Sequence, residues 1–245
     1  TIPGKFHDIS FQLRRGEILG VAGLMGAGRT ELMEAIIGER QVSGGEIYLH
    51  GKKINNRIPG DAIARGIAMV PEDRKKNGVF LRLNVKNNIL MSSFGKCMKG
   101  ISICEKLENK YMDEYREKLD IKTSSPKQIC QNLSGGNQQK VAVARVLNSE
   151  PEIIILDEPT RGIDVRTKSE IHRLMSALAC TGKAVLMVSS ELPEILGMSD
   201  RILVLHEGTM TGILDRSEAT ADKIMELAVA TKRSENYGGQ IDRKS

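Results

Sequence analysis

The chain has 245 residues, of which 40% are hydrophobic and 27% charged, so it can bury a core and is not expected to be disordered. No apolar run approaches the roughly 18–20 residues of a membrane-spanning helix, so any role at a membrane requires a partner that spans it. The net charge is +5, but aromatic residues make up only 3% and Trp is absent, so the chain is poorly supplied with surfaces for stacking nucleic-acid bases.

The first predicted elements surround a glycine-rich loop. Residues 8–13 alternate apolar and polar side chains and predict a half-buried strand, and residues 17–22 predict a more continuous apolar strand. Residues 23–30, GLMGAGRT, follow directly and match the phosphate-loop pattern G-x-x-x-x-G-K-S/T except that Arg29 replaces the lysine. Residues 30–37 have helical spacing, so strand, glycine loop and helix come in the order that a phosphate loop requires.

This loop is the first candidate nucleotide site. Its backbone N–H groups can surround a β-phosphate, and the helix that follows directs its positive end there. Arginine is longer than lysine and forked, so Arg29 could bind phosphate without lying between the β- and γ-phosphates, and we expect weakened stabilisation of the transition state. Thr30 can bind Mg²⁺ through its hydroxyl. The expected binding residues are Gly23, Gly26, Ala27, Gly28, Arg29, Thr30 and Glu31.

The middle of the chain changes character. Residues 46–51 and 67–70 predict two more strands, but from Glu72 to about Gln131 the strand-like runs disappear. Residues 85–91 and 105–119 instead carry charge with a helical period. We interpret this segment as a helical insertion in an α/β core.

The octapeptide LSGGNQQK at residues 133–140 is the second candidate site. Ser134 can cap the start of a helix, and the glycines after it leave backbone N–H groups open to a phosphate. The phosphate loop already surrounds the chain's own nucleotide. Ser134, Gly135 and Gly136 therefore suit a second nucleotide, presented by another domain.

A buried strand at residues 153–156 delivers two carboxylates to its end. Asp157 is placed to hold Mg²⁺ through water, and Glu158 is placed to polarise an attacking water molecule. From residue 166 to residue 205 predicted helices and strands alternate, as in a mostly parallel sheet with helices on both faces. The polar tail at residues 231–245 is expected to be loose.

The cysteines and the start of the chain give two further indications. Four cysteines and four histidines are spread without a C-x-x-C pair or a ligand cluster, which favours reduced cysteines in a cytosolic protein over a metal or disulfide site. The chain begins at Thr1 without Met or a signal-like stretch, and we expect it to be a segment of a longer polypeptide.

These three motifs, in this order and separated by a helical insertion, resemble the nucleotide-binding domain of ATP-binding cassette (ABC) proteins from about Asp8 to Gly212. Four segments are more narrowly similar to the second, C-terminal ATPase domain of bacterial monosaccharide importers, in which two cassettes are fused. They are residues 23–31 (GLMGAGRTE), 70–74 (VPEDR), 160–164 (TRGID) and 188–194 (VSSELPE).

The resemblance implies a fold and a domain division. The expected fold is α/β: a P-loop NTPase (RecA-like) core with a mostly parallel sheet, an N-terminal antiparallel β portion and an inserted α-helical subdomain. Residues 1–71 and 141–230 would form the ATP-binding core, and residues 72–140 the helical subdomain with the signature motif LSGGNQQK.

The resemblance also assigns roles, with departures from the family pattern. Glu72 stands where the family has a glutamine that touches Mg²⁺ and the membrane partner, so it is an expected metal and nucleotide ligand. Ser190 stands where a catalytic histidine senses the γ-phosphate, and Asp164 matches the acid of a loop that crosses the dimer interface. The family's adenine-stacking aromatic residue would precede Thr1.

Cassettes of this family pair head to tail, with each ATP held between one phosphate loop and the other signature. We therefore expect this domain to bind ATP and Mg²⁺ at a site altered at Arg29, Glu72 and Ser190, and to lend its intact signature to its partner's ATPase site. Because Glu158 could still polarise an attacking water molecule, residual ATP hydrolysis at this site stays open as an alternative. The implied partners are the first ATPase domain of the same polypeptide, a transmembrane permease contacted near residues 72–94 and, indirectly, a periplasmic sugar-binding protein, at the cytoplasmic face of the bacterial inner membrane.

Two alternatives stay open. One is a nucleotide-binding and dimerisation module without hydrolysis of its own. The other is a soluble cassette ATPase of DNA repair or translation, for which we would expect a long coiled-coil insertion, zinc-binding cysteines or a basic linker, and the sequence shows none of these. The domain does not indicate which sugar or related cargo is carried, and no nucleic-acid partner is expected.

Overall fold

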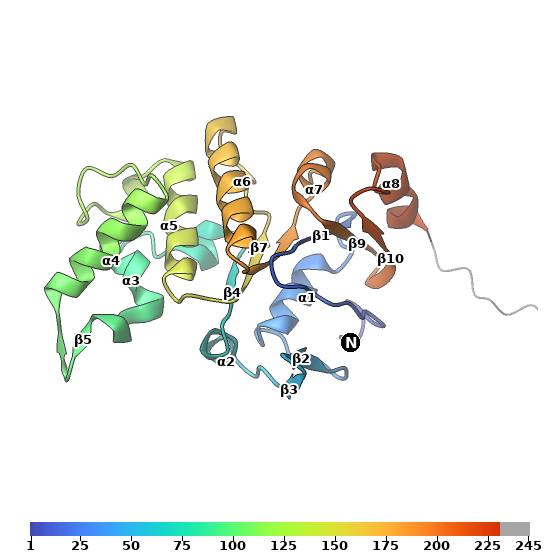
Figure 1. Cartoon of the computed structure of the whole chain (residues 1–245), viewed down its shortest axis with the longest axis horizontal. Coiled ribbons are helices and arrows are strands. Elements are labelled where there is room, and N and C mark those ends of the chain that lie inside the picture. Colours follow the sequence, from blue (N-terminus) through green and yellow to red (C-terminus); the bar gives the residue numbers. More distant parts are fainter. Residues whose placement is uncertain (231–245) are drawn as a thin grey trace, which may run out of the picture.

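The computed structural model describes residues 1–230, and the tail expected to be loose at 231–245 lies outside the described residues. A six-stranded sheet forms the centre (Figure 1). Its strands are β1 (Ile18–Gly23), β4 (Ile67–Val70), β7 (Ile153–Asp157), β8 (Ala184–Val188), β9 (Arg201–His206) and β10 (Thr209–Asp215), in the order β10-β9-β1-β8-β7-β4. All neighbours in this order run parallel except β10 and β9, so the expectation of a mostly parallel sheet is confirmed.

Helices cover both faces of the sheet. They are α1 (Arg29–Ile36), α2 (Pro59–Ala64), α3 (Val85–Leu90), α4 (Glu105–Lys118), α5 (Gly135–Leu147), α6 (Val165–Cys180), α7 (Leu192–Met198) and α8 (Ala221–Val229). Successive residues of a strand point to opposite faces. In β7, Ile154 and Leu156 join an apolar cluster with α3 to α8, whereas Ile155 joins a second cluster with α1 and α2. Burial on both faces explains why this strand is an unbroken apolar run.

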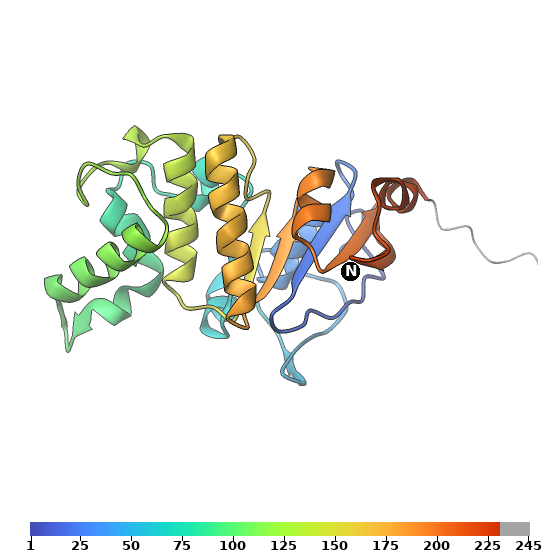
Figure 2. The same cartoon turned by 45° about the horizontal axis from the view of Figure 1, so that its top comes forward.

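The segment between β4 and β7 forms a largely helical lobe at one end of the sheet, and α5 and α6 lie side by side (Figures 1 and 2). The lobe contains α3, α4 and α5, whose apolar side chains share one cluster. It also contains a small hairpin of β5 (Met98–Lys99) and β6 (Ser102–Ile103), so the expectation that strands disappear from this segment is wrong at that point. The predicted domain boundary between residues 140 and 141 falls inside α5, and the division stays a prediction.

The N-terminal segment differs from the prediction. Ile9, Phe11 and Leu13 pack against the cluster on the α1 face and the residues between them are exposed, as the alternation predicted. However, residues 8–13 form no strand, because no neighbouring strand pairs with them. Alternation reports one buried face of an extended chain, whereas a strand also needs a hydrogen-bonded neighbour. The antiparallel strands between α1 and α2 are β2 (Ile47–Leu49) and β3 (Lys52–Ile54).

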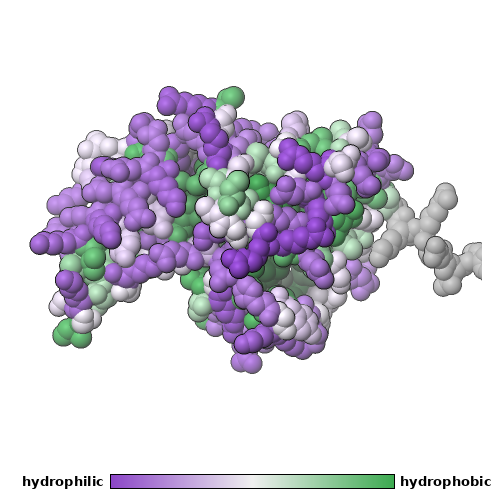
Figure 3. Space-filling model, viewed as in Figure 1, coloured by the Kyte–Doolittle hydropathy of each residue, from purple (hydrophilic) through white to green (hydrophobic). Residues whose placement is uncertain are grey.

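The surface is largely hydrophilic in the view of Figure 3, with apolar atoms gathered at the tip where Figure 1 places β5. Ile101, in the turn of that hairpin, is 98% exposed. Among the helices of residues 1–230, none combines the length and the apolar character that crossing a membrane requires.

Candidate functional site

The phosphate loop joins the end of β1 to the start of α1. A Cβ atom at Gly23 would lie 2.5 Å from the carbonyl oxygen of Leu205, and one at Gly28 would lie 2.7 Å from that of Lys5. These two glycines therefore let the loop pack closely against Leu205 at the end of β9 and against Lys5 in the N-terminal segment. Gly26 has φ 81° and open space around it. Its backbone is the part of the loop that an incoming phosphate can approach.

The start of α1 is open to an anion. Gly28 caps the helix in a left-handed conformation and, being glycine, has no side chain that could accept from the first N–H groups. Ala27 is buried, and its carbonyl oxygen accepts a hydrogen bond from the N–H of Gly208. Thr30 is half-buried in the first turn, and Glu31 pairs with Lys5 at 2.9 Å. The predicted loop residues thus lie together, but Glu31 turns toward the N-terminal segment.

Arg29 reaches across to the ends of β7 and β8. Its guanidinium donates to the carbonyl oxygen of Ser189 at 2.7 Å and lies 3.6 Å from the carboxylate of Glu158. The other carboxylate oxygen of Glu158 accepts a hydrogen bond from the hydroxyl of Ser190 at 3.0 Å. The side chains of Arg29 and Glu158 are only 12% and 8% exposed. Two of the three departures from the family pattern therefore converge on the carboxylate expected to polarise water.

Asp157 lies deeper in the same site. It is fully buried, and neither carboxylate oxygen has a hydrogen-bond partner within residues 1–230. Burial raises the pKa of Asp157 to about 6, an effect that the neighbouring Thr30 hydroxyl opposes. A buried carboxylate without partners beside a threonine hydroxyl fits a divalent cation.

The donor set also fits Mg²⁺ in its number of ligands. Mg²⁺ is usually held by one or two carboxylates together with phosphates and water rather than by a cage of side chains. Within residues 1–230 no group of three or more His, Cys, Asp or Glu residues could hold a metal ion. Thr30 and Asp157 would hold such a cation together with phosphate oxygens of a nucleotide.

Glu72, the third expected metal ligand, has a different partner. It forms an ion pair with Arg161, which lies after β7; the Arg161 side chain is exposed and Glu72 is half-buried. Among the described residues it makes no hydrogen bond or ion pair with Thr30 or Asp157. Its role as a ligand remains a prediction.

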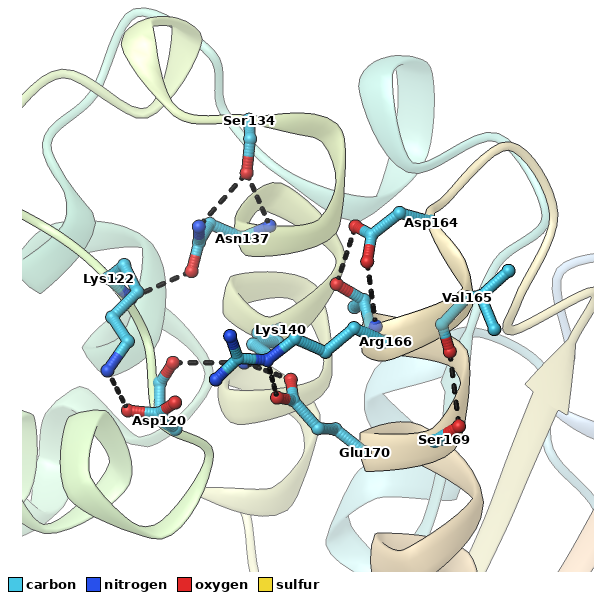
Figure 4. Close-up of polar contacts among 11 residues, drawn as sticks. Asp120, Lys122, Ser134, Asn137, Lys140, Asp164, Val165, Arg166, Ser169 and Glu170 are labelled. Carbon is cyan, nitrogen blue, oxygen red and sulfur yellow. Dashed lines mark hydrogen bonds and ion pairs between the residues drawn. The ribbon is translucent and has the colours of Figure 1, made fainter.

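The signature motif forms the start of α5. Ser134 is exposed and caps the helix, and its hydroxyl oxygen accepts hydrogen bonds from the backbone N–H of Asn137 at 3.3 Å and from its Nδ2 at 3.0 Å (Figure 4). A Cβ atom at Gly136 would lie 2.6 Å from Oγ1 of Thr167, and one at Gly135 would lie 3.0 Å from the guanidinium of Arg74. Gly136 therefore allows the start of α5 to pack against the start of α6, and Gly135 leaves room for the guanidinium of Arg74.

Asp164 caps α6 beside the signature. Its carboxylate accepts hydrogen bonds from the backbone N–H of Thr167 at 3.0 Å and from its hydroxyl at 2.8 Å, and these bonds lower the pKa of Asp164. Arg74 donates to the carbonyl oxygens of Arg161 at 3.1 Å and Gly162 at 3.4 Å. Elements far apart in the sequence thus bring the signature and the predicted interface acid to one face.

Sequence reasoning assigned no role to Lys140 at the end of the octapeptide. Its side chain is 6% exposed, and its ammonium group donates to the carbonyl oxygen of Asp120 at 2.9 Å and pairs with Glu170 at 2.6 Å (Figure 4). The hydrogen bond from Lys140 lowers the pKa of Glu170. A polar run inside an otherwise apolar helix signals such buried partners, because an unpaired buried charge is costly.

Comparison with known proteins gives concordant results. A family profile described as "ABC transporter" matches residues 6–161. The ribose import ATP-binding protein RbsA of Clostridium tetani is 52% identical over 227 residues, which are 92% of this chain and 45% of that protein. The xylose import ATP-binding protein XylG of Thermoanaerobacter pseudethanolicus is 51% identical over 234 residues, 94% of this chain and 46% of that protein. The chain spans about half the length of the curated relatives it matches.

Solved structures show the same fold at low identity. A nucleotide-free ATP-binding cassette from an ABC transporter matches with a TM-score of 0.78 at 19% identity, covering 93% of both chains. The ADP conformation of the cassette MJ1267 matches with a TM-score of 0.76 at 21% identity, again covering 93% of both chains. The predicted cassette fold is therefore confirmed.

Proposed function

The chain belongs to the ABC transporter family, and on that premise we propose that it is the ATP-binding, energy-coupling cassette of a bacterial monosaccharide importer. Its relatives are named for the import of ribose, of xylose, or of ribose, galactose and methyl galactoside. These names support sugar import over the alternative of a soluble cassette in DNA repair or translation. They differ in the sugar but share the import of monosaccharides, which is the class of cargo proposed here.

We propose next that the chain's own site binds ATP and Mg²⁺ but hydrolyses ATP slowly or not at all. The observation that supports this is the pairing of Glu158 with both Arg29 and Ser190. A carboxylate polarises an attacking water molecule by accepting a hydrogen bond from it. Here one oxygen of Glu158 faces the Arg29 guanidinium and the other accepts from the Ser190 hydroxyl, so neither oxygen is free to accept a hydrogen bond from an attacking water molecule.

Each of the chain's own groups has a distinct task in this proposal. The open N–H groups of the phosphate loop and of α1 bind the phosphates, and Thr30 with Asp157 would hold Mg²⁺, which neutralises phosphate charge when bound. Arg29 points toward Ser189 and Glu158, so its positive charge is already partly neutralised by Glu158 before a nucleotide binds. Binding is thereby separated from hydrolysis.

We further propose that Ser134, Gly135, Gly136 and Asp164 serve a nucleotide held by a partner cassette. Ser134 is exposed at the start of α5, and Asp164 caps the neighbouring helix. The curated relatives are about twice as long as this chain, which leaves room for a first ATPase domain in the same polypeptide. A permease contacting residues 72–94, a periplasmic sugar-binding protein and a place at the cytoplasmic face of the inner membrane complete the proposal.

Single-turnover ATPase measurements on the polypeptide assembled with its partner cassette test this assignment. Ser134→Arg places a bulky cation at the donated face and should abolish turnover at the partner's site. Glu158→Gln should leave most turnover intact, because Glu158 is already engaged. An inactive Glu158→Gln variant alongside an unaffected Ser134→Arg variant would reverse the assignment. Trapping of ADP, located by domain, separates slow hydrolysis at this site from none.

A further inference from the structure

We propose that Asn137 is a positioning residue: its carboxamide fixes the Ser134 hydroxyl as a hydrogen-bond donor toward a phosphate oxygen of the partner's nucleotide. The inference rests on the proposed function, which assigns Ser134 to that nucleotide. It concerns a residue of the octapeptide for which neither the sequence nor the comparisons supply a role.

The carboxamide of Asn137 has a defined orientation. Its Oδ1 accepts a hydrogen bond from the backbone N–H of Lys122 at 2.7 Å (Figure 4). A backbone N–H can only donate, so a reversed amide would place two donors against each other. The amide oxygen therefore faces Lys122, and the amide nitrogen faces Ser134.

The Ser134 hydroxyl has both of its acceptor positions filled by Asn137. Its oxygen accepts from Nδ2 of Asn137 at 3.0 Å and from the backbone N–H of the same residue at 3.3 Å. A hydroxyl has two lone pairs and one hydrogen, so both acceptor positions are used and the hydrogen is left to donate. No residue in the range 1–230 accepts it. Because Ser134 is exposed, an acceptor-only group such as a phosphate oxygen is the complementary partner.

Lys122 is held in place by the loop that contains it. It lies in the loop between α4 and α5, which borders a cavity of about 590 Å³ together with Ser134 and Asn137. The loop is braced from within: the side-chain oxygen of Gln128 accepts from the hydroxyl of Thr123 and from the backbone N–H of Ser124, both at 2.8 Å. The direction of the Ser134 hydroxyl is therefore set by a braced loop through one carboxamide.

A purely structural role for Asn137 is the competing explanation, because it also lies in the first turn of α5. The variant Asn137→Asp separates the two roles. Aspartate in a first turn favours the helix through the helix dipole, and one carboxylate oxygen can still accept from Lys122. Its other oxygen accepts instead of donating, so the Ser134 hydrogen turns inward and is lost to the nucleotide.

The experiment measures kcat/KM for ATP and thermal stability in the polypeptide assembled with its partner cassette. We expect Asn137→Asp to lower kcat/KM about 10- to 100-fold, the range for one hydrogen bond to a charged group, without lowering the midpoint of thermal unfolding. Asn132→Asp is the matched control, because it adds the same charge at an exposed residue lining the same cavity; it should stay within about twofold of the parent.

A double-mutant cycle completes the test. If Asn137 acts through Ser134, the double variant Ser134→Ala/Asn137→Ala should lose no more activity than Ser134→Ala alone. Additive losses, or full activity of Asn137→Asp while Ser134→Ala is impaired, would overturn the positioning role and leave the proposed function standing. Full activity of Ser134→Ala would overturn both.

Discussion

Glu158→Gln should lower the stability of the chain, because it leaves the Arg29 guanidinium buried without its counter-charge. Removing one partner of a buried ion pair typically costs about 3–5 kcal/mol. Arg29 keeps its hydrogen bond to the carbonyl oxygen of Ser189, and the distance of 3.6 Å to Glu158 is long for a direct bond. These two facts place the expected loss at the low end, about 3 kcal/mol in the free energy of unfolding.

Urea denaturation measures this loss as a lower midpoint with an unchanged slope. For a chain of this size about 3 kcal/mol also corresponds to a fall of roughly 6–12 °C in Tm. The matched control is Glu46→Gln, which breaks the solvent-exposed pair between Glu46 and Lys53 and should leave the urea midpoint nearly unchanged. If Glu158→Gln were no more destabilising than Glu46→Gln, Arg29 would not hold Glu158, and the explanation of the engaged carboxylate would fail.

Three further outcomes are expected. Arg29→Lys alone should not restore turnover at this site, because Ser190 still lacks a histidine's charge; a full rescue in steady-state assays contradicts this. Asp157 has a folded-state pKa of about 6, above its ordinary 3.8, so its contribution to the free energy of unfolding is complete below about pH 4 and falls by about 3 kcal/mol as the pH rises through 6. Urea titrations without Mg²⁺ at several pH values should show this fall, and Asp157→Asn should abolish it. Gly136→Ala should cost about 1–3 kcal/mol by forcing α5 away from Thr167, and adding Thr167→Ala should recover part of it; equal losses in both variants would disprove the contact.

The sequence predicted most of the central sheet, for a physical reason. Strands covered on both faces are continuous apolar runs, so β4, β7 and β8 could be located within a residue or so. β10 was missed because it is an edge strand whose residues are nearly all half-exposed, and it shows no apolar run. The predicted strand at residues 8–13 failed for the opposite reason, since its pattern was right and its neighbour was absent.

The sequence predicted which residues belong to the candidate site but not which of them contact one another. The motifs located Arg29, Glu158 and Ser190 separately, and each residue was assigned the task of its family counterpart. Their mutual pairing depends on how β1, β7 and β8 end beside one another, which is a property of strand order. The contact between Lys122 and Asn137 could not be predicted either, because Lys122 donates through its backbone N–H, a group that nearly every residue type has.

The close packing of α5 on α6 has a mechanical consequence. Three contacts join the helical lobe to segments that follow β7: Gly136 with Thr167, Lys140 with Glu170, and Arg74 with Gly162. A rotation of the lobe that separated α5 from α6 would break the contacts of Gly136 with Thr167 and of Lys140 with Glu170. Ser134 at the start of α5 and Asp164 at the start of α6 are therefore held at a spacing that is set by contacts within this chain, independently of any partner.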